Sequence, residues 1–154
     1  MHDGPMRSHY RFDHAWRVDA APDAVLALLE DVREYGAWWP AVRVTGGSVD
    51  GAIRAADVEV RAPLGYRLRI TLTEVPAPAG AGELRATISG DLDGWSAWTV
   101  APDGDGTRVG FTQEVDARQP LLRGASAVLH GAFARQHAAV MRSAEAGMRT
   151  ALAA

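Results

Sequence analysis

Strand-length segments separated by turn signals fill the middle of the chain, and they constrain its fold more than any other feature. Apolar and polar residues alternate in runs such as 66–73, 83–88 and 108–115. Clusters of glycine, proline and aspartate separate these runs. Alternation with a period of two is typical of strands that bury one face. The short connections between the runs therefore predict an antiparallel meander of about six strands.

Other patterns flank this meander. Residues 10–18 also alternate, which predicts one further strand at the start of the domain. A short helix is expected to begin near Pro22, because proline is favoured in the first turn. A second short helix is expected over Val32 to Trp38, ending before Pro40, since the residue preceding a proline disfavours helix.

The last part of the chain has a helical period. From Pro120 onward the apolar residues fall on one stripe, and Arg135, Arg142 and Arg149 fall nearly opposite to them. A curved antiparallel sheet wrapped around this long helix would bury one face of every element. The sequence thus predicts an α+β fold as one domain over residues 10–154, with residues 1–9 as a flexible arm.

Composition excludes several chemistries. All 16 basic residues are arginine and the chain has no cysteine. Lysine Schiff bases, P-loop lysines, thiol nucleophiles, disulfides and thiolate zinc sites are therefore excluded. The five histidines follow no metal-binding spacing, so no metal or cofactor is expected.

Charge and hydropathy limit the partners. A net charge of −3 argues against a nucleic-acid binder, which usually has a basic excess. No run of apolar residues is long enough to cross a membrane, and residues 1–8 do not resemble a secretory signal. A cytoplasmic location is the default expectation.

Several short motifs occur in a familiar order. The sequence resembles the START/Bet v 1-like (SRPBCC) superfamily, in particular bacterial polyketide cyclase/dehydrase and lipid-transport proteins, from about Tyr10 to Leu152. The resemblance rests on Trp16-Arg17-Val18, Trp38-Trp39-Pro40, residues 61–68, Gly90-Asp91-Leu92-Asp93-Gly94 with Trp98, Gly106-Thr107-Arg108-Val109, and Gln136-His137 with Met141 and Gly147-Met148.

This resemblance implies a helix-grip fold, in which a curved antiparallel sheet grips the C-terminal α-helix around an apolar cavity. It also implies a hydrophobic ligand, such as a lipid, polyketide or other apolar small molecule, although only some members are enzymes. Several positions depart from the family pattern, among them Gly65, Gln113, Gln136 and Ala138. Gln113 stands where tryptophan is common, and Ala138 leaves a polar partner missing beside His137.

Two histidines are the candidate acid–base groups. His14 lies on the apolar face of the first predicted strand, and His137 lies beside the apolar stripe of the long helix. Either histidine can titrate near neutral pH. The alternative for His14, which we favour, is a core histidine satisfied by backbone or water, or one at the solvent edge of the face. For His137 the catalytic and structural interpretations are equally open. The two side chains could converge, because the gripped helix faces the sheet.

Two glutamines lie on faces that are otherwise apolar. A buried amide needs hydrogen-bonding partners, so Gln113 and Gln136 are expected to orient a polar group of the ligand or to bond neighbouring backbone. Asp57 and Glu59 share a strand face that we interpret as solvated rather than catalytic. The expected ligand contacts are Phe12, Trp38, Leu68, Ile70, Trp98, Phe111, Gln113, Leu129, Phe133, Gln136 and Val140.

Three functions remain open at this stage. The first is a polyketide cyclase/dehydrase-like enzyme, in which orientation and proton transfer by a histidine or water close the rings. The second is a non-catalytic carrier or sensor that shields an apolar ligand from water. The third is a protein-interaction module, which should expose an apolar patch. The protein is expected to be a monomer or a homodimer.

Overall fold

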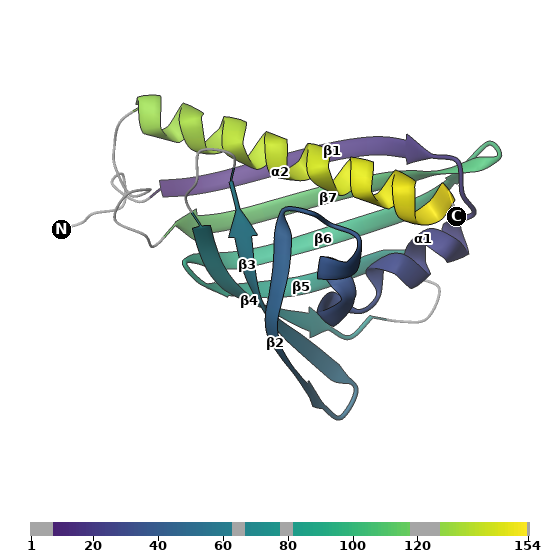
Figure 1. Ribbon diagram of the computed structural model, residues 1–154, viewed down its shortest axis with the longest axis horizontal. Helices are drawn as coiled ribbons and strands as arrows, with labels where there is room; N and C mark the ends of the chain where they lie inside the picture. Colours follow the sequence, from purple (N-terminus) through teal and green to yellow (C-terminus); the bar gives the residue numbers. More distant parts are fainter. Residues whose placement is uncertain (1–7, 63–66, 78–81, 118–126, 154) are drawn as a thin grey trace.

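A single antiparallel sheet and a long helix make up most of the fold (Figure 1). The computed structural model describes residues 8–62, 67–77, 82–117 and 127–153. In chain order the elements are β1 (Ser8–Val18), α1 (Pro22–Leu29), the 3₁₀ helix η2 (Val32–Ala37), β2 (Val42–Asp50), β3 (Ile53–Arg61), β4 (Arg67–Val75), β5 (Glu83–Gly90), β6 (Leu92–Asp103), β7 (Gly106–Ala117) and α2 (Ala127–Ala153).

The sheet is a meander of β2 to β7, to which one long-range pairing adds β1 as an edge strand. Its strand order is β1-β7-β6-β5-β4-β3-β2, and every neighbouring pair is antiparallel. The first strand therefore lies beside the last one, so that Phe12 pairs with Gln113 and His14 pairs with Phe111. The predicted antiparallel sheet is confirmed, with β2 to β7 as the expected six strands.

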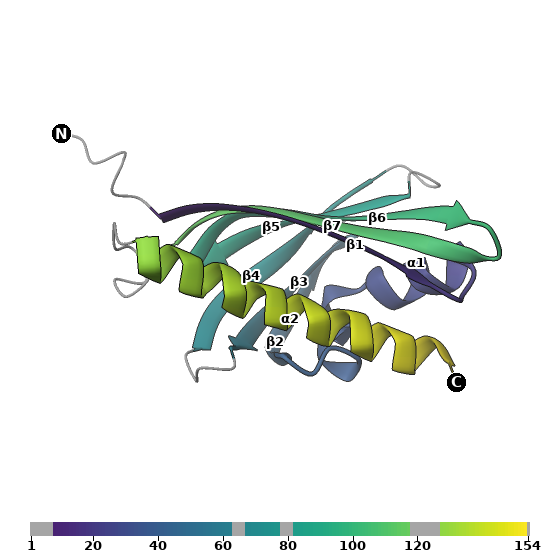
Figure 2. The same cartoon turned by 90° about the horizontal axis from the view of Figure 1, so that it is seen from above.

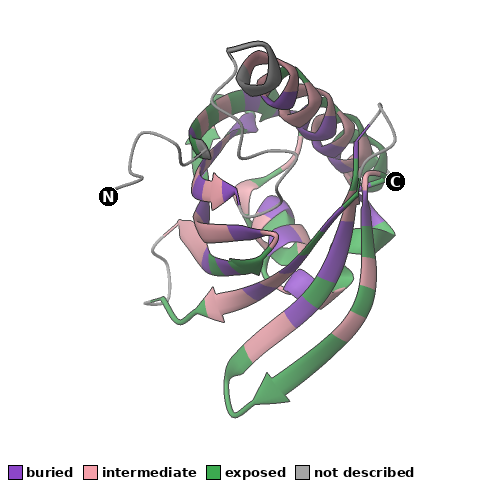
Figure 3. Cartoon of the chain, turned by 90° about the vertical axis from the view of Figure 1, so that its left-hand side faces the viewer, coloured by how far each residue is buried: buried purple, intermediate pink, exposed green. Residues whose placement is uncertain are grey.

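Helix α2 runs along the concave side of the sheet (Figures 1 and 2). Seen from one end, the strands curl and α2 lies across their open side, with buried positions turned inward (Figure 3). Phe133, Val140 and Ala144 on the predicted apolar stripe are buried, while Arg135 and Arg142 are exposed. This arrangement is the helix-grip fold that the resemblance implied.

The N-terminal elements follow the expected start signals. Proline lies in the first turn of α1, and the Asp31 side chain accepts a hydrogen bond from the backbone N–H of Arg33 to cap η2. Strand β1 begins at Ser8, so residues 8 and 9 belong to the domain rather than to the expected arm. His9 is held there by Asp116 and Glu114 of the neighbouring strand.

A glycine lets α2 approach the segment before β2. A Cβ atom at Gly147 would lie 1.8 Å from the carbonyl oxygen of Trp38, so no other residue fits without displacement. Nearby, the Trp39 Nε1–H donates to the Val140 carbonyl over 3.0 Å. Ala41 N–H donates to Ser143 Oγ over 3.2 Å. These contacts fix α2 across the sheet and set the height of the space beneath it.

Candidate functional site

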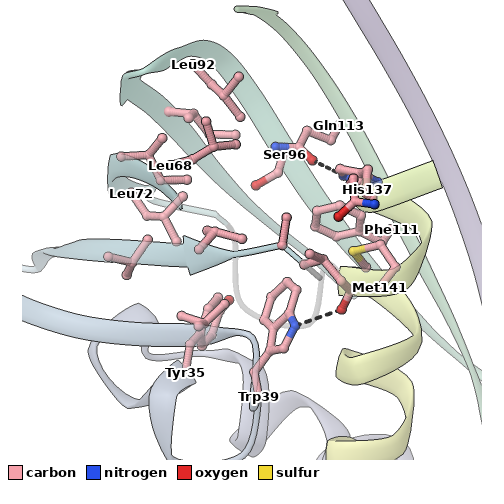
Figure 4. A pocket seen from close by; sticks show the side chains of 18 of the residues that line it. Tyr35, Trp39, Leu68, Leu72, Leu92, Ser96, Phe111, Gln113, His137 and Met141 are labelled. Carbon is pink, nitrogen blue, oxygen red and sulfur yellow. Dashed lines mark hydrogen bonds between the residues drawn. The ribbon is translucent and has the colours of Figure 1, made fainter. Parts of the chain in front are cut away.

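A cavity lies between the concave face of the sheet and α2 (Figure 4). It holds about 70 Å³ of space into which the centre of a water-sized sphere fits. Its wall is almost entirely apolar. The lining residues are Tyr35, Trp39, Val42, Val58, Val60, Ala62, Leu68, Ile70, Leu72, Ile88, Leu92, Ser96, Trp98, Phe111, Gln113, Phe133, Gln136, His137, Val140 and Met141.

Most of the predicted ligand contacts meet at this cavity. The sequence-predicted residues that line it are Leu68, Ile70, Trp98, Phe111, Gln113, Phe133, Gln136, His137 and Val140. Phe12, His14 and Trp38 are not in the wall. The side chain of Leu129 lies outside the described residues. Trp38 was expected at the cavity, but its buried ring packs on Trp39 and Trp98 instead.

The edge strand β1 supplies a layer of rings behind the wall. The Phe12 ring stacks on the His137 ring with centroids 3.6 Å apart and an interplanar angle of 6°. The His14 ring lies 5.4 Å from the His137 ring, at an angle of 26°. The two histidines therefore converge, which the sequence left open. They meet beside the cavity, because β1 lies at the edge of the sheet next to α2.

His137 and Gln113 join the helix to the last strand. His137 Nε2 donates to Gln113 Oε1 over 2.6 Å, which places the imidazole proton on Nε2. Gln113 is only 7% exposed. His137 Nδ1 is buried and has no hydrogen-bond partner among the described residues. The amide and imidazole thus make one polar spot in an apolar wall.

Burial keeps both histidines neutral. Desolvation, together with the nearby His14, lowers the pKa of His137 to about 3. Desolvation also lowers the pKa of His14, and the negative charge of Asp13 opposes this shift. At neutral pH the site therefore contains uncharged imidazoles. Because a general acid works best with a pKa near the operating pH, the resting His137 is suited to hydrogen bonding rather than to donating a proton.

Sequence reasoning missed Ser96. This side chain is 8% exposed and lines the cavity next to Gln113, its register partner on β7. A signal was present in the sequence, since Ser96 precedes Trp98 by two positions and a strand places such residues on one face. Tyr35, Trp39 and Met141 were also missed as lining residues.

Glu59 differs from the expected solvated face. It is buried on β3 between Arg61 and Arg69, each with an Nε atom 3.9 Å from a Glu59 carboxylate oxygen. The prediction of a solvated side chain is wrong for Glu59, because the long arginines of its own and the neighbouring strand cover it. It does not line the cavity.

Among the described residues, no cluster of three or more histidine, aspartate or glutamate side chains could hold a metal ion. Within the same part of the chain, no helix is long and apolar enough to cross a membrane.

Comparison with protein families identifies the relatives of this fold. The model of the family described as polyketide cyclase / dehydrase and lipid transport matches residues 9–149. The chain belongs to this family. A search of curated proteins found no match. The family match confirms the START/Bet v 1-like relationship expected from the sequence. A START superfamily protein from Mycobacterium smegmatis is among the similar structures.

Several solved structures share the fold at low sequence identity. TTHA0849 from Thermus thermophilus is 19% identical with a TM-score of 0.71, over 92% of this chain and 94% of that one. The Zhui aromatase/cyclase from a Streptomyces species is 17% identical with a TM-score of 0.65, over 94% and 91%. The di-domain ARO/CYC StfQ from the steffimycin biosynthetic pathway is 14% identical with a TM-score of 0.73. That match covers 92% of this chain and 50% of StfQ.

Proposed function

We propose that this family member binds an oxygenated, otherwise apolar molecule of polyketide or aromatic type in the cavity. There it acts as a cyclase/dehydrase-like protein that holds a reactive chain in a folded shape. The observation that carries this proposal is the hydrogen-bonded pair of His137 and Gln113 in an otherwise largely apolar wall. A cavity for a pure hydrocarbon gains nothing from such a pair, because polar groups without ligand partners cost free energy.

Orientation is the chemistry that this wall can supply. Aromatic rings from the sheet and from the η2–β2 segment border the space, including Phe111, Trp98 and Trp39. Flat rings favour flat or enolised ligand segments by offset stacking. Holding two reacting carbons of one chain in contact converts a search among many conformers into a single step. The neutral His137 then orients a ligand oxygen through Gln113 rather than titrating.

A non-catalytic carrier is the second candidate. It is supported by the burial of His137 Nδ1, which leaves this nitrogen without open surface toward a ligand. The interaction module has less support. The exposed large apolar side chains among the described residues are Val49, Ile53 and Val75, and none of them lies on the two short helices that were considered for docking.

The test is cyclisation of a synthetic poly-β-ketone thioester in the presence and absence of the protein. We expect one cyclic product to dominate with the protein, and a mixture from spontaneous ring closure without it. The His137→Phe variant keeps a ring against Phe12 but loses the bond to Gln113, so it should return the mixture. An unchanged product mixture with the wild-type protein would favour the carrier.

A second measurement does not depend on the chosen substrate. Native mass spectrometry and solvent extraction of the purified protein would identify a co-purified molecule. A bound oxygenated aromatic or polyketide supports the proposal. A bound saturated hydrocarbon chain without oxygen near Gln113 would contradict it.

A further inference from the structure

We infer that Ser96 and Gln113 together form a two-donor site for one carbonyl oxygen, so that the cavity selects ketones and enolates. This inference rests on the proposed function, because it assigns the chemical group that is bound in the same cavity. It adds Ser96, a residue that has no part in the His137–Gln113 bond.

Strand register places the two side chains next to each other. Ser96 on β6 is the direct partner of Gln113 on β7. Directly opposite residues in antiparallel strands have Cβ atoms about 5 Å apart on the same face. Both side chains line the cavity and are more than nine-tenths buried. A carbonyl oxygen has two lone pairs, so it can accept one hydrogen bond from each of two such neighbours.

The bond to His137 sets the direction of the Gln113 amide. The amide oxygen accepts from His137 Nε2, so the amide NH₂ group is left for another partner. In Figure 4 the amide oxygen of Gln113 lies on the His137 side and the nitrogen lies on the Ser96 side. With the Nε2 proton of His137 donated to the amide oxygen, the NH₂ group of Gln113 faces away from His137.

The Ser96 hydroxyl has no competing side-chain partner in the described part of the chain. Its neighbour on the other side is Ala86 of β5, which offers no polar side-chain atom. A hydroxyl group and an amide NH₂ in an apolar wall are unfavourable unless water or a ligand meets them. A ligand carbonyl between them meets both donors at once. A ligand hydroxyl can also accept from these donors, but its own hydrogen then needs a further acceptor, which a carbonyl does not require.

The test uses two small isosteric probes. Acetophenone carries the carbonyl, and α-methylstyrene has a CH₂ group in place of its oxygen. Dissociation constants for both are measured by ligand-observed NMR with the wild-type protein, with Ser96→Ala and with Ser89→Ala. The last variant removes an exposed hydroxyl from β5 and is the matched control. The infrared carbonyl band of bound acetophenone is recorded with each protein.

We expect Ser96→Ala to weaken acetophenone binding roughly fivefold and to leave α-methylstyrene binding unchanged. The bound carbonyl band should also move to higher frequency in Ser96→Ala but not in Ser89→Ala, because one donor is lost. An equal change for both probes, or an unmoved carbonyl band, would overturn the two-donor site while leaving ligand binding intact. If neither probe bound the wild-type cavity, the proposed function itself would fail.

Discussion

The imidazole rings of His14 and His137 stack with centroids 5.4 Å apart, bringing together the edge strand β1 and helix α2. Neither ring has a carboxylate partner close enough to form an ion pair among the described residues. Protonation of either ring would therefore place a charge in a poorly solvated region beside a second titratable ring. The pair couples the stability of the fold to pH.

Stability should fall in mild acid because of His137. Its pKa is about 3 in the folded protein and about 6.5 in the unfolded chain. Between these values the unfolded state binds more protons, so the free energy of unfolding rises with pH. The slope from this group approaches about 1.4 kcal/mol per pH unit. Urea unfolding at pH 7.5, 5.5 and 4.5 measures how the free energy of unfolding changes with pH. His137→Phe should flatten the profile across this range.

His9 provides the internal control for the pH profile. Hydrogen bonds to Asp116 and Glu114 raise the pKa of His9 above 6.5. Its stabilising contribution is therefore present below pH 6.5 and is lost as the pH rises through the folded pKa, which is the opposite sign. His9→Gln should lower stability at pH 5.5 and have no effect at pH 9. A flat profile in the wild-type protein would contradict the burial of His137.

Loss of the Gln113 amide should destabilise the fold through its partner. Gln113→Leu leaves the Nε2–H of His137 buried without an acceptor, which costs about 1–3 kcal/mol. The double variant Gln113→Leu/His137→Phe replaces both polar groups with apolar ones. It should recover much of that loss, since removing both partners of a buried bond can be nearly neutral. A double-mutant cycle in urea measures the coupling, and additive losses would count against the bond.

The sequence predicted elements well and contacts between distant elements poorly. Alternation and helical period are local properties of the sequence. The alternation over residues 42–115 therefore predicted the sheet, and the apolar stripe predicted α2. The pairing of β1 with β7 leaves no local trace, and the approach of His14 to His137 depends on it. The register that places Ser96 beside Gln113 is different, because the tight turn between Asp103 and Gly106 fixes it locally within the β6–β7 hairpin.

The position of Trp38 also depends on packing between distant elements, in this case on α2. The Trp38 motif predicted a place near the cavity. Which of the two neighbouring tryptophans lines the cavity is decided by how α2 crosses the segment that carries them. The close approach of Gly147 to the Trp38 carbonyl places Trp39 in the cavity wall and buries Trp38 behind it. Such a crossing is set by packing between elements rather than by either segment alone.

That close approach gives a further prediction. Gly147→Ala places a Cβ atom 1.8 Å from the Trp38 carbonyl oxygen, so the helix must move and stability should fall by several kcal/mol. Gly131→Ala is the matched control in the same helix, because its nearest neighbour is an Arg135 side-chain nitrogen at 3.8 Å. It should stabilise the helix by up to about 1 kcal/mol. Thermal and urea unfolding of both variants give the comparison, and equal effects would contradict the contact.

The size of the cavity gives the last prediction. Its 70 Å³ is smaller than the roughly 150 Å³ that holds a benzene molecule in a protein core. Lining side chains must therefore separate before a ring enters. Ile70→Ala removes part of the wall and enlarges the cavity, which should lower the free energy of unfolding by about 2–5 kcal/mol. It should also tighten benzene binding, because the lining side chains then need to separate less to admit the ring. Ile53→Ala removes the same atoms from an exposed position outside the cavity and should change neither quantity appreciably. Benzene affinity by NMR decides the matter. Equal affinities of Ile70→Ala and the wild-type protein would show that cavity volume does not limit entry.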